Sequence, residues 1–213
     1  MNIVFEGING SGKTTLINSL KDEFEKEKIK YTYISDLKYD TPLKPVLEMM
    51  VKDSVFAELK NEFKTSIFES LVFAANHHYI QEKLKNEKGI FLYDRDYISV
   101  LGYQKGIIQK EYIDWEKFYI AFREIMLFEL KKIDLLVYLS VPMDENIRRI
   151  ESRNNKKYSK EDIDLLLGLR NNVEEEVKKA QEQYNIPTLY LSGIEEPKEN
   201  IKLIKTKITG FNI

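Results

Sequence analysis

A glycine-rich segment near the start of the chain has the composition and spacing of a phosphate-binding loop. Residues 7–14 read GINGSGKT, which matches the pattern Gly-x-x-x-x-Gly-Lys-Ser/Thr, between a short apolar run and an amphipathic stretch. Glycines let the backbone point successive N–H groups at phosphate oxygens, and the dipole of a following helix attracts the same anion. We therefore expect ATP or GTP to bind here. The predicted contacts are Gly7, Asn9, Gly10, Ser11, Gly12, Lys13, Thr14 and Thr15.

Two side chains of this loop and one beyond it predict the chemistry done on the triphosphate. Lys13 should reach the β- and γ-phosphates as a catalytic cation, and the Thr14 hydroxyl should ligate Mg²⁺. Asp94 follows a later apolar run, and a carboxylate at a strand end beside such a loop can hold the water shell of the same ion. The sequence thus predicts a magnesium site built from Thr14 and Asp94.

Arg95 comes next and is the candidate for binding a second phosphate-bearing molecule. Its guanidinium stays charged and matches a phosphate with two parallel hydrogen bonds, which would make it a catalytic residue that holds an acceptor. Ser99, Tyr103 and Gln104 follow, where a helix would turn polar groups toward the same acceptor. The alternative is that Asp94 and Arg95 merely cap this helix.

A cluster of arginines, Arg148, Arg149 and Arg153, precedes the most polar segment of the chain. Phosphoryl transfer needs cations besides Mg²⁺, and Arg149 and Arg153 share a helix face at positions i and i+4. We expect these two to be catalytic; the alternative is a solvated face paired with nearby acids. Arg170 differs because it falls on the apolar side of a helix, where it needs a phosphate or a carboxylate as partner.

These residues must be positioned by a framework of alternating strands and helices. Five apolar runs of strand length are separated by longer stretches with apolar residues three or four apart, which are typical of helices. No hairpin turn joins adjacent runs, so the pattern predicts a parallel sheet covered on both faces, with ligands at the carboxyl ends of its strands. The predicted strands are Ile3–Phe5, Tyr31–Ile34, Ile90–Tyr93, Leu135–Leu139 and Thr188–Leu191.

The polar segment Ser152–Asp162 reads as a loop that ends where a helix starts. Ser159 and Asp162 have the spacing of a capping box, which predicts a helix beginning at this point. The apolar side of this helix is predicted to carry Ile163, Leu166, Leu167, Val173, Val177 and Tyr184.

Composition limits the class of protein. The 213 residues with 43% hydrophobic content fill one core, so we expect a single domain. Lys and Arg total 33 against 35 for Asp and Glu, which gives no broad cationic field for polymeric nucleic acid or a membrane surface. The lack of cysteine excludes thiolate chemistry and fits a reducing compartment. Neither a leader peptide nor a long apolar segment is visible, so the cytoplasm is the expected location.

Three segments together carry a family resemblance. The opening FEGINGSGKTT, the stretch LVFAANHHYIQ and the run DRDYISVLGYQKG resemble, in this order, the thymidylate kinases. The resemblance implies an α/β fold of the P-loop NTPase type, with three α/β/α layers around a five-stranded parallel sheet. It implies one kinase domain over residues 1–213, with acceptor-binding helices at about 36–88 and a short lid at about 148–160. It also implies transfer of the γ-phosphoryl group of ATP to dTMP with Mg²⁺, and a homodimer.

The resemblance also implies which side chains bind substrate. Phe73 stands where the family stacks an aromatic ring on thymine, and residues 192–194 stand where it forms part of the adenine pocket. Glu6 belongs to the family's opening, and it would be the general base if the acceptor were a nucleoside. The predicted substrate-binding residues are Glu6, Lys38, Tyr39, Phe73, His77, Arg95, Ser99, Tyr103 and Gln104.

Three positions depart from the family pattern and leave the acceptor open. Asn9 replaces an Asp, His77 replaces an Arg that reads the base, and Lys38 with Tyr39 replaces an Arg on the acceptor phosphate. A deoxynucleoside kinase, a kinase for another small metabolite and an inactive nucleotide-binding homologue therefore remain alternatives. A switch GTPase is disfavoured, because residues 155–158 read NKKY and lack the acid of a guanine reader.

Overall fold

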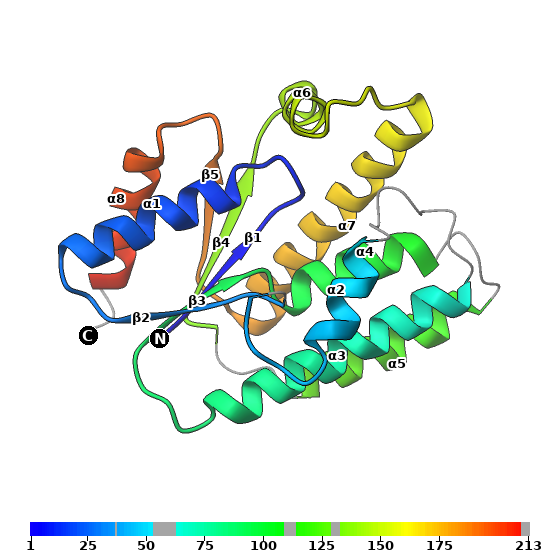
Figure 1. The fold of residues 1–213 in the computed structure, drawn as a ribbon, viewed down its shortest axis with the longest axis horizontal. Helices are drawn as coiled ribbons and strands as arrows, with labels where there is room; N and C mark the ends of the chain where they lie inside the picture. Colours follow the sequence, from blue (N-terminus) through cyan, green and yellow to red (C-terminus); the bar gives the residue numbers. More distant parts are fainter. Residues whose placement is uncertain (37, 53–62, 109–113, 129–132, 210–213) are drawn as a thin grey trace.

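In the computed structural model, five parallel strands form one sheet in the order β2-β3-β1-β4-β5 (Figure 1). The structure describes residues 1–36, 38–52, 63–108, 114–128 and 133–209. Each strand contains one of the five predicted apolar runs, so these predictions are confirmed. The strands are β1 (Asn2–Glu6), β2 (Tyr31–Ile34), β3 (Ile90–Asp94), β4 (Leu135–Ser140) and β5 (Thr188–Ser192).

The centre of the sheet is β1, in which Ile3–Phe5 is fully buried. This strand pairs with β3 on one side and β4 on the other, so that Phe5 lies opposite both Asp94 and Val137. Apolar runs without polar alternation are typical of parallel strands that are covered on both faces. The register brings the carboxyl ends of these three strands to one edge of the sheet, where Glu6 and Asp94 lie.

Helices cover both faces of the sheet (Figure 1). The described helices are α1 (Lys13–Lys26), α2 (Lys44–Lys52), α3 (Phe63–Leu84), α4 (Tyr97–Ile108), α5 (Trp115–Phe128), α6 (Met143–Asn154), α7 (Lys160–Tyr184) and α8 (Pro197–Thr209). Side chains of α1 and α8 share one core cluster with the strands, whereas α3, α4, α5 and α7 contribute to a second cluster. This three-layer α/β/α arrangement confirms the predicted fold class. Across the described ranges, no helix is long and apolar enough to span a membrane.

Helices occupy parts of the two regions that were expected to contact substrate. Residues 36–88 contain α2 and α3, although residues 53–62 lie outside the described part. Residues 148–160 contain the second half of α6 and its connection to α7. Their roles as acceptor site and lid stay predictions.

Helix α7 begins at the predicted capping box. The Ser159 hydroxyl accepts a hydrogen bond from the Asp162 backbone N–H, and the Asp162 carboxylate accepts one from the Ser159 backbone N–H. The predicted apolar side is wrong at Leu167 and Tyr184, which are both 42% exposed. Leu167 lies about 100° around the helix from the buried Leu166, and Tyr184 is the last helical residue.

The predicted loop over Ser152–Asp162 is shorter in the structure. Helix α6 continues through residues 152–154, and Asn155, with a φ of 49°, forms its C-cap in a left-handed conformation. Only Asn155–Ser159 connects α6 to α7. The exposed last turn of α6 is polar because it faces solvent, and polarity alone did not distinguish it from a loop.

Candidate active site

The glycine-rich segment connects β1, which ends at Glu6, to α1, which begins at Lys13. Gly12 has a φ of 97° and forms the N-cap of α1, in a left-handed conformation that glycine adopts without a Cβ clash. The first-turn N–H groups of α1, which have no partner within the helix, therefore follow directly after the loop backbone. The predicted order of strand, loop and helix is confirmed.

Helix α6 packs against this loop through Asn146, a residue that was not predicted from the sequence. The Asn146 amide Nδ2 donates a hydrogen bond of 2.7 Å to the backbone carbonyl of Asn9, and Asn146 is fully buried. Gly10 lies against the same side chain, since a Cβ at this position would be 2.9 Å from Asn146 Nδ2. Asn146 was hard to identify from the sequence, because a single Asn on a polar helix does not reveal which face of the helix is buried.

A cavity of about 640 Å³ opens above the loop, which is a typical size for a small-molecule site. The loop residues form one wall, Arg149 and Arg153 of α6 form a second, and residues 193–197 after β5 form a third. Asn200 also lines the cavity and donates from its Nδ2 to the Ser192 carbonyl at 2.8 Å. Gly193 and Ile194, expected in the adenine pocket, thus lie in the cavity wall, whereas Ser192 orients the segment.

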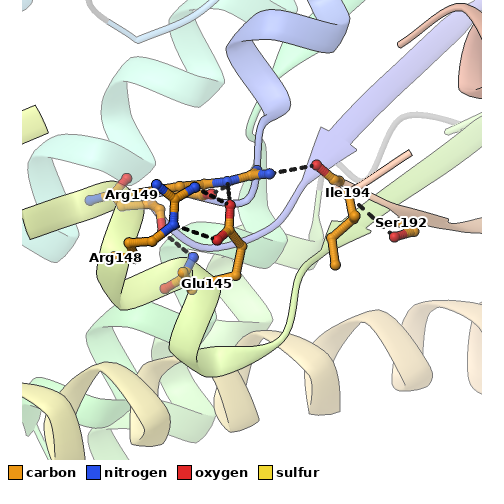
Figure 2. Close-up of polar contacts among 9 residues, drawn as sticks. Glu145, Arg148, Arg149, Ser192 and Ile194 are labelled. Atoms are coloured by element: carbon orange, nitrogen blue, oxygen red, sulfur yellow. Dashed lines mark hydrogen bonds and ion pairs between the residues drawn. The ribbon is translucent and has the colours of Figure 1, made fainter. Parts of the chain in front are cut away.

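The arginines of α6 take different positions, as Figure 2 shows. Arg149 donates from Nε to Glu145 at 2.6 Å and from Nη2 to the Gly193 carbonyl at 3.0 Å, so it spans two cavity walls. Arg148 makes two hydrogen bonds to the same carboxylate but is 70% exposed in its side chain. These hydrogen bonds from both guanidinium groups lower the pKa of Glu145 to about 2.

Arg153 and Arg170 also differ in their surroundings. Arg153 lines the cavity, and its Nε donates a long hydrogen bond of 3.4 Å to Asn154 Oδ1. Arg170 donates to Glu174 at 2.9 Å and to the Val141 carbonyl at 3.0 Å, which confirms that it needed an acid. The solvated-face alternative therefore describes Arg148, while Arg149 and Arg153 are turned toward the cavity.

Lys13 lines the cavity, and Asp94 lies beside it. Lys13 Nζ is 4.0 Å from Asp94 Oδ1, and the lysine side chain is only 7% exposed. Burial, and then the neighbouring Arg95, lower the pKa of Lys13. A triphosphate in the loop would supply the anion that restores full protonation of this amine.

Arg95 connects the loop to the acceptor side of the molecule. Its Nη2 donates to Asn9 Oδ1 at 2.9 Å, its Nη1 donates to Ser99 Oγ at 2.8 Å, and its guanidinium carbon lies 5.0 Å from the centre of the Tyr103 ring. The backbone of Arg95 has a φ of 74°, which residues with a Cβ seldom adopt. The structure thus brings together Asn9, Arg95, Ser99 and Tyr103, which were predicted separately.

Glu6 serves as the cap of α4. Its carboxylate is fully buried and accepts hydrogen bonds from the backbone N–H groups of Asp96 and Ser99, at 2.9 and 3.2 Å, and from the Ser99 hydroxyl. Burial raises the pKa of Glu6, against the effect of Arg95 and of these donors. Since Glu6 caps the helix, Asp94 and Arg95 are not needed for that purpose, contrary to the capping alternative.

His77 lies between two carboxylates. Its Nδ1 is 2.9 Å from Asp96 Oδ1 and its Nε2 is 3.6 Å from Asp36 Oδ1, while Asn76 donates to Asp36 at 2.9 Å. Burial acts to lower the pKa of His77, but Asp36 and Asp96 outweigh it and raise the pKa to about 9. Sequence reasoning missed Asp36, although a carboxylate just after a strand of a parallel sheet was a usable signal.

The remaining predicted acceptor residues surround this cluster. Phe73 and Tyr39 are partly buried and pack against the core cluster that includes α4 and α7. Gln104 is buried, and its Oε1 accepts a hydrogen bond of 2.9 Å from the Ser70 hydroxyl on α3. Lys38 Nζ lies 5.3 Å from the centre of the Tyr33 ring. Contacts of these residues with a substrate stay predictions.

A parallel sheet of this strand order, a glycine-rich loop between β1 and α1, and a carboxylate ending β3 together define a phosphotransferase of the P-loop class. Residues 5–201 match the family model described as thymidylate kinase, and the chain therefore belongs to the thymidylate kinase family.

Comparisons with individual proteins agree with this membership. A probable thymidylate kinase of Pyrococcus abyssi is 28% identical over 219 residues, covering 98% of both chains. The probable thymidylate kinase 1 of Saccharolobus solfataricus is 31% identical over 187 residues, covering 86% of this chain and 84% of that protein. The solved structure of a deoxyadenosine kinase from M. mycoides with bound dATP superposes with a TM-score of 0.71, covering 98% of this chain and all of that chain. At 21% identity, this last likeness supports the fold alone.

Proposed function

We propose that the protein transfers the γ-phosphoryl group of ATP to dTMP and releases ADP and dTDP. The observation that carries the proposal is the hydrogen bond between Arg95 Nη2 and Asn9 Oδ1. It ties the cation expected to hold the acceptor phosphate directly to the loop expected to hold the donor phosphates, and such juxtaposition is what transfer requires. Family membership supports dTMP as the acceptor.

The transfer breaks the bond between the γ-phosphorus and the oxygen that bridges it to the β-phosphate, and ADP keeps that oxygen. An anionic oxygen of the dTMP phosphate forms the new bond, so no proton has to be removed from the acceptor. Lys13, Arg149 and Arg153, which all line the cavity, would stabilise the charge on the moving group.

The residues that would hold Mg²⁺ are Thr14 and Asp94. Thr14 is exposed in the cavity wall, and Asp94 ends β3 beside Lys13, so both offer the oxygen ligands that Mg²⁺ prefers. When bound, the ion would neutralise charge on the β- and γ-phosphates.

The acceptor would lie among side chains from α3 and α4. Arg95 would hold its phosphate with help from Lys38 and Tyr39. Phe73 would contact the base, and the polar residues of α4 would contact the sugar and base. The His77 Nδ1 atom is engaged by Asp96, whereas Nε2 lies 3.6 Å from Asp36 Oδ1 without a hydrogen bond, so Nε2 is the ring nitrogen that would donate to a base carbonyl. The polar residues of α4 that would contact the sugar and base are Ser99, Tyr103 and Gln104.

A deoxynucleoside acceptor is supported less well. Its hydroxyl would need a general base, and Glu6, the expected candidate, has its carboxylate committed to Ser99 and to the backbone of Asp96. A monophosphate acceptor needs no such base, so the hydrogen bonds of Glu6 favour the monophosphate.

The proposal is tested by mixing the protein with Mg-ATP and following ADP formation with dTMP, dUMP, dCMP, dGMP and thymidine. We expect turnover with dTMP, little with thymidine, and a loss of at least about a hundredfold in Lys13→Ala, which lacks the cation on the β- and γ-phosphates. Turnover of thymidine but not dTMP would replace the proposal with a nucleoside kinase. A protein that turns over none of these acceptors, yet binds ATP, would support the inactive homologue.

We also propose that the protein is a cytoplasmic homodimer. Helix α3 exposes Phe68 and Leu71, at 48% and 47%, on a helix whose opposite side packs against α4. Exposed apolar side chains on one helix are typical of surfaces that associate. Light scattering should give about twice the chain mass of 25.2 kDa, and a monomer mass would contradict the dimer. The location rests on the lack of cysteine and is checked by cell fractionation.

A further inference from the structure

Tyr33 lies on β2, whose neighbour in the sheet is β3. Its hydroxyl donates a hydrogen bond of 3.0 Å to Oδ2 of Asp94 at the end of β3. The other oxygen of the same carboxylate, Oδ1, faces Lys13 Nζ at 4.0 Å. Each oxygen of Asp94 therefore has its own neighbour, one from β2 and one from the phosphate loop.

This arrangement fixes the rotation of the Asp94 carboxylate. The terminal torsion of an aspartate is broad, so without a partner its two oxygens exchange position easily. The Tyr33 hydroxyl is a neutral donor, so it can hold Oδ2 without forming an ion pair with the carboxylate.

The Tyr33 ring is itself held by cations from two elements. Lys21 Nζ of α1 lies 4.9 Å from the ring centre, and Lys38 Nζ lies 5.3 Å from it. Both distances are within the range of cation–π attraction. The ring is thus held by one lysine from α1, the helix that follows the phosphate loop, and by one lysine from the segment that follows β2.

We propose that Tyr33 is a positioning residue for the magnesium site, which orients Asp94 so that its carboxylate meets the water shell of Mg²⁺ on the bound triphosphate. The inference rests on the Mg-ATP binding of the proposed function but not on the identity of the acceptor. Groups that orient a metal-binding carboxylate commonly change metal affinity by about ten- to a hundredfold. We expect a smaller effect, because phosphates supply much of the binding.

The test uses Tyr33→Phe, which removes only the hydroxyl, with Tyr31→Phe as the matched control. Tyr31 lies on the same strand, and its hydroxyl donates instead to Glu25 at 2.8 Å, on an exposed surface. With ATP fixed and no acceptor present, the unfolding temperature is followed as Mg²⁺ is titrated. The Mg²⁺ concentration at half of the full shift should rise about three- to tenfold in Tyr33→Phe and stay unchanged in Tyr31→Phe.

A purely structural role of the hydroxyl would lower the unfolding temperature at every Mg²⁺ concentration without moving the midpoint. Coincident midpoints for the two variants and the unmodified protein would therefore overturn the inference. A protein that Mg-ATP does not stabilise at all would overturn the proposed nucleotide binding together with this inference. A protein that binds Mg-ATP but ignores dTMP would leave the inference intact, so the two failures are distinguishable.

Discussion

Single side chains explain why two departures from the family pattern are compatible with activity. Asn9 accepts a hydrogen bond from Arg95 through a neutral amide, so it orients the guanidinium without neutralising it. An aspartate at the same position would form an ion pair with Arg95 and compete with an acceptor phosphate for it. His77 is charged between two carboxylates and so keeps a cation where the family has an arginine.

The charge on His77 predicts a loss of stability in mildly alkaline solution. The pKa is raised from 6.5 to about 9 in the folded chain, so the folded state keeps a proton that the unfolded state releases. The stabilisation is complete below pH 6.5 and is lost as pH rises through 9, by on the order of 2–3 kcal/mol in the free energy of unfolding. Urea unfolding at pH 6 and pH 9.5 measures this fall in the free energy of unfolding.

His77→Gln is the control, because glutamine can donate a hydrogen bond but does not titrate. Its free energy of unfolding should fall less between the two pH values than that of the unmodified protein. Equal losses would show that another group whose pKa is raised in the folded chain, such as Glu6, accounts for the pH dependence.

At the scale of elements, α6 joins the two sides of the donor cavity. Asn146 holds the carbonyl of Asn9, and Arg149 bridges Glu145 to the Gly193 carbonyl beyond β5. A shift of this one helix would therefore move the phosphate loop and the residues 193–197 together.

The pair Arg148 and Arg149 tests the role of α6 in catalysis. Both bind Glu145, but only Arg149 lines the cavity. Arg149→Ala should lower kcat/KM for ATP by about a hundredfold, because a cation on the transferring group is lost. Arg148→Ala should stay within about twofold, as exposed ion pairs contribute little. Steady-state kinetics with varied ATP gives both values, and equal effects would contradict a direct role of Arg149.

Much of the site was predictable because its motifs are local. The loop pattern placed Lys13 and Thr14, and the strand-end rule placed Asp94 and Arg95. The partners that come from other elements were not predictable: Tyr33 meets Asp94 across 61 residues, and periodicity does not reveal that β2 neighbours β3. Asn146 was not predictable for the same reason, because its partner, the backbone carbonyl of Asn9, is 137 residues away in the sequence.

At the scale of the whole molecule, the close packing of α4 on α7 is sensitive to side-chain volume. A Cβ at Gly102 of α4 would lie 2.9 Å from backbone atoms of Val173, which cannot move without shifting α7. Gly102→Ala should therefore destabilise the fold by about 1–3 kcal/mol. Gly168→Ala, in α7 with no atom within 4 Å of the new Cβ, should stabilise it by about 0.5–1 kcal/mol. Chemical denaturation of both variants checks the opposite signs.

The architecture was predicted almost entirely, because apolar runs such as those of β1 and β4 are typical of parallel strands buried on both faces. The errors lie at surfaces and at ends of elements. Leu167 was assigned to the buried side by its type, although apolar residues also occur on surfaces. Residues 152–154 were assigned to a loop, although they form the last turn of α6.

The positive φ of Arg95 creates a conflict between stability and activity in this molecule. Glycine at that position would relieve about 1 kcal/mol of backbone strain, yet it would remove the guanidinium that joins the loop to the acceptor side. Engineering this scaffold for robustness has to score both properties at once, because a residue with a strained backbone is also one that the proposed reaction needs.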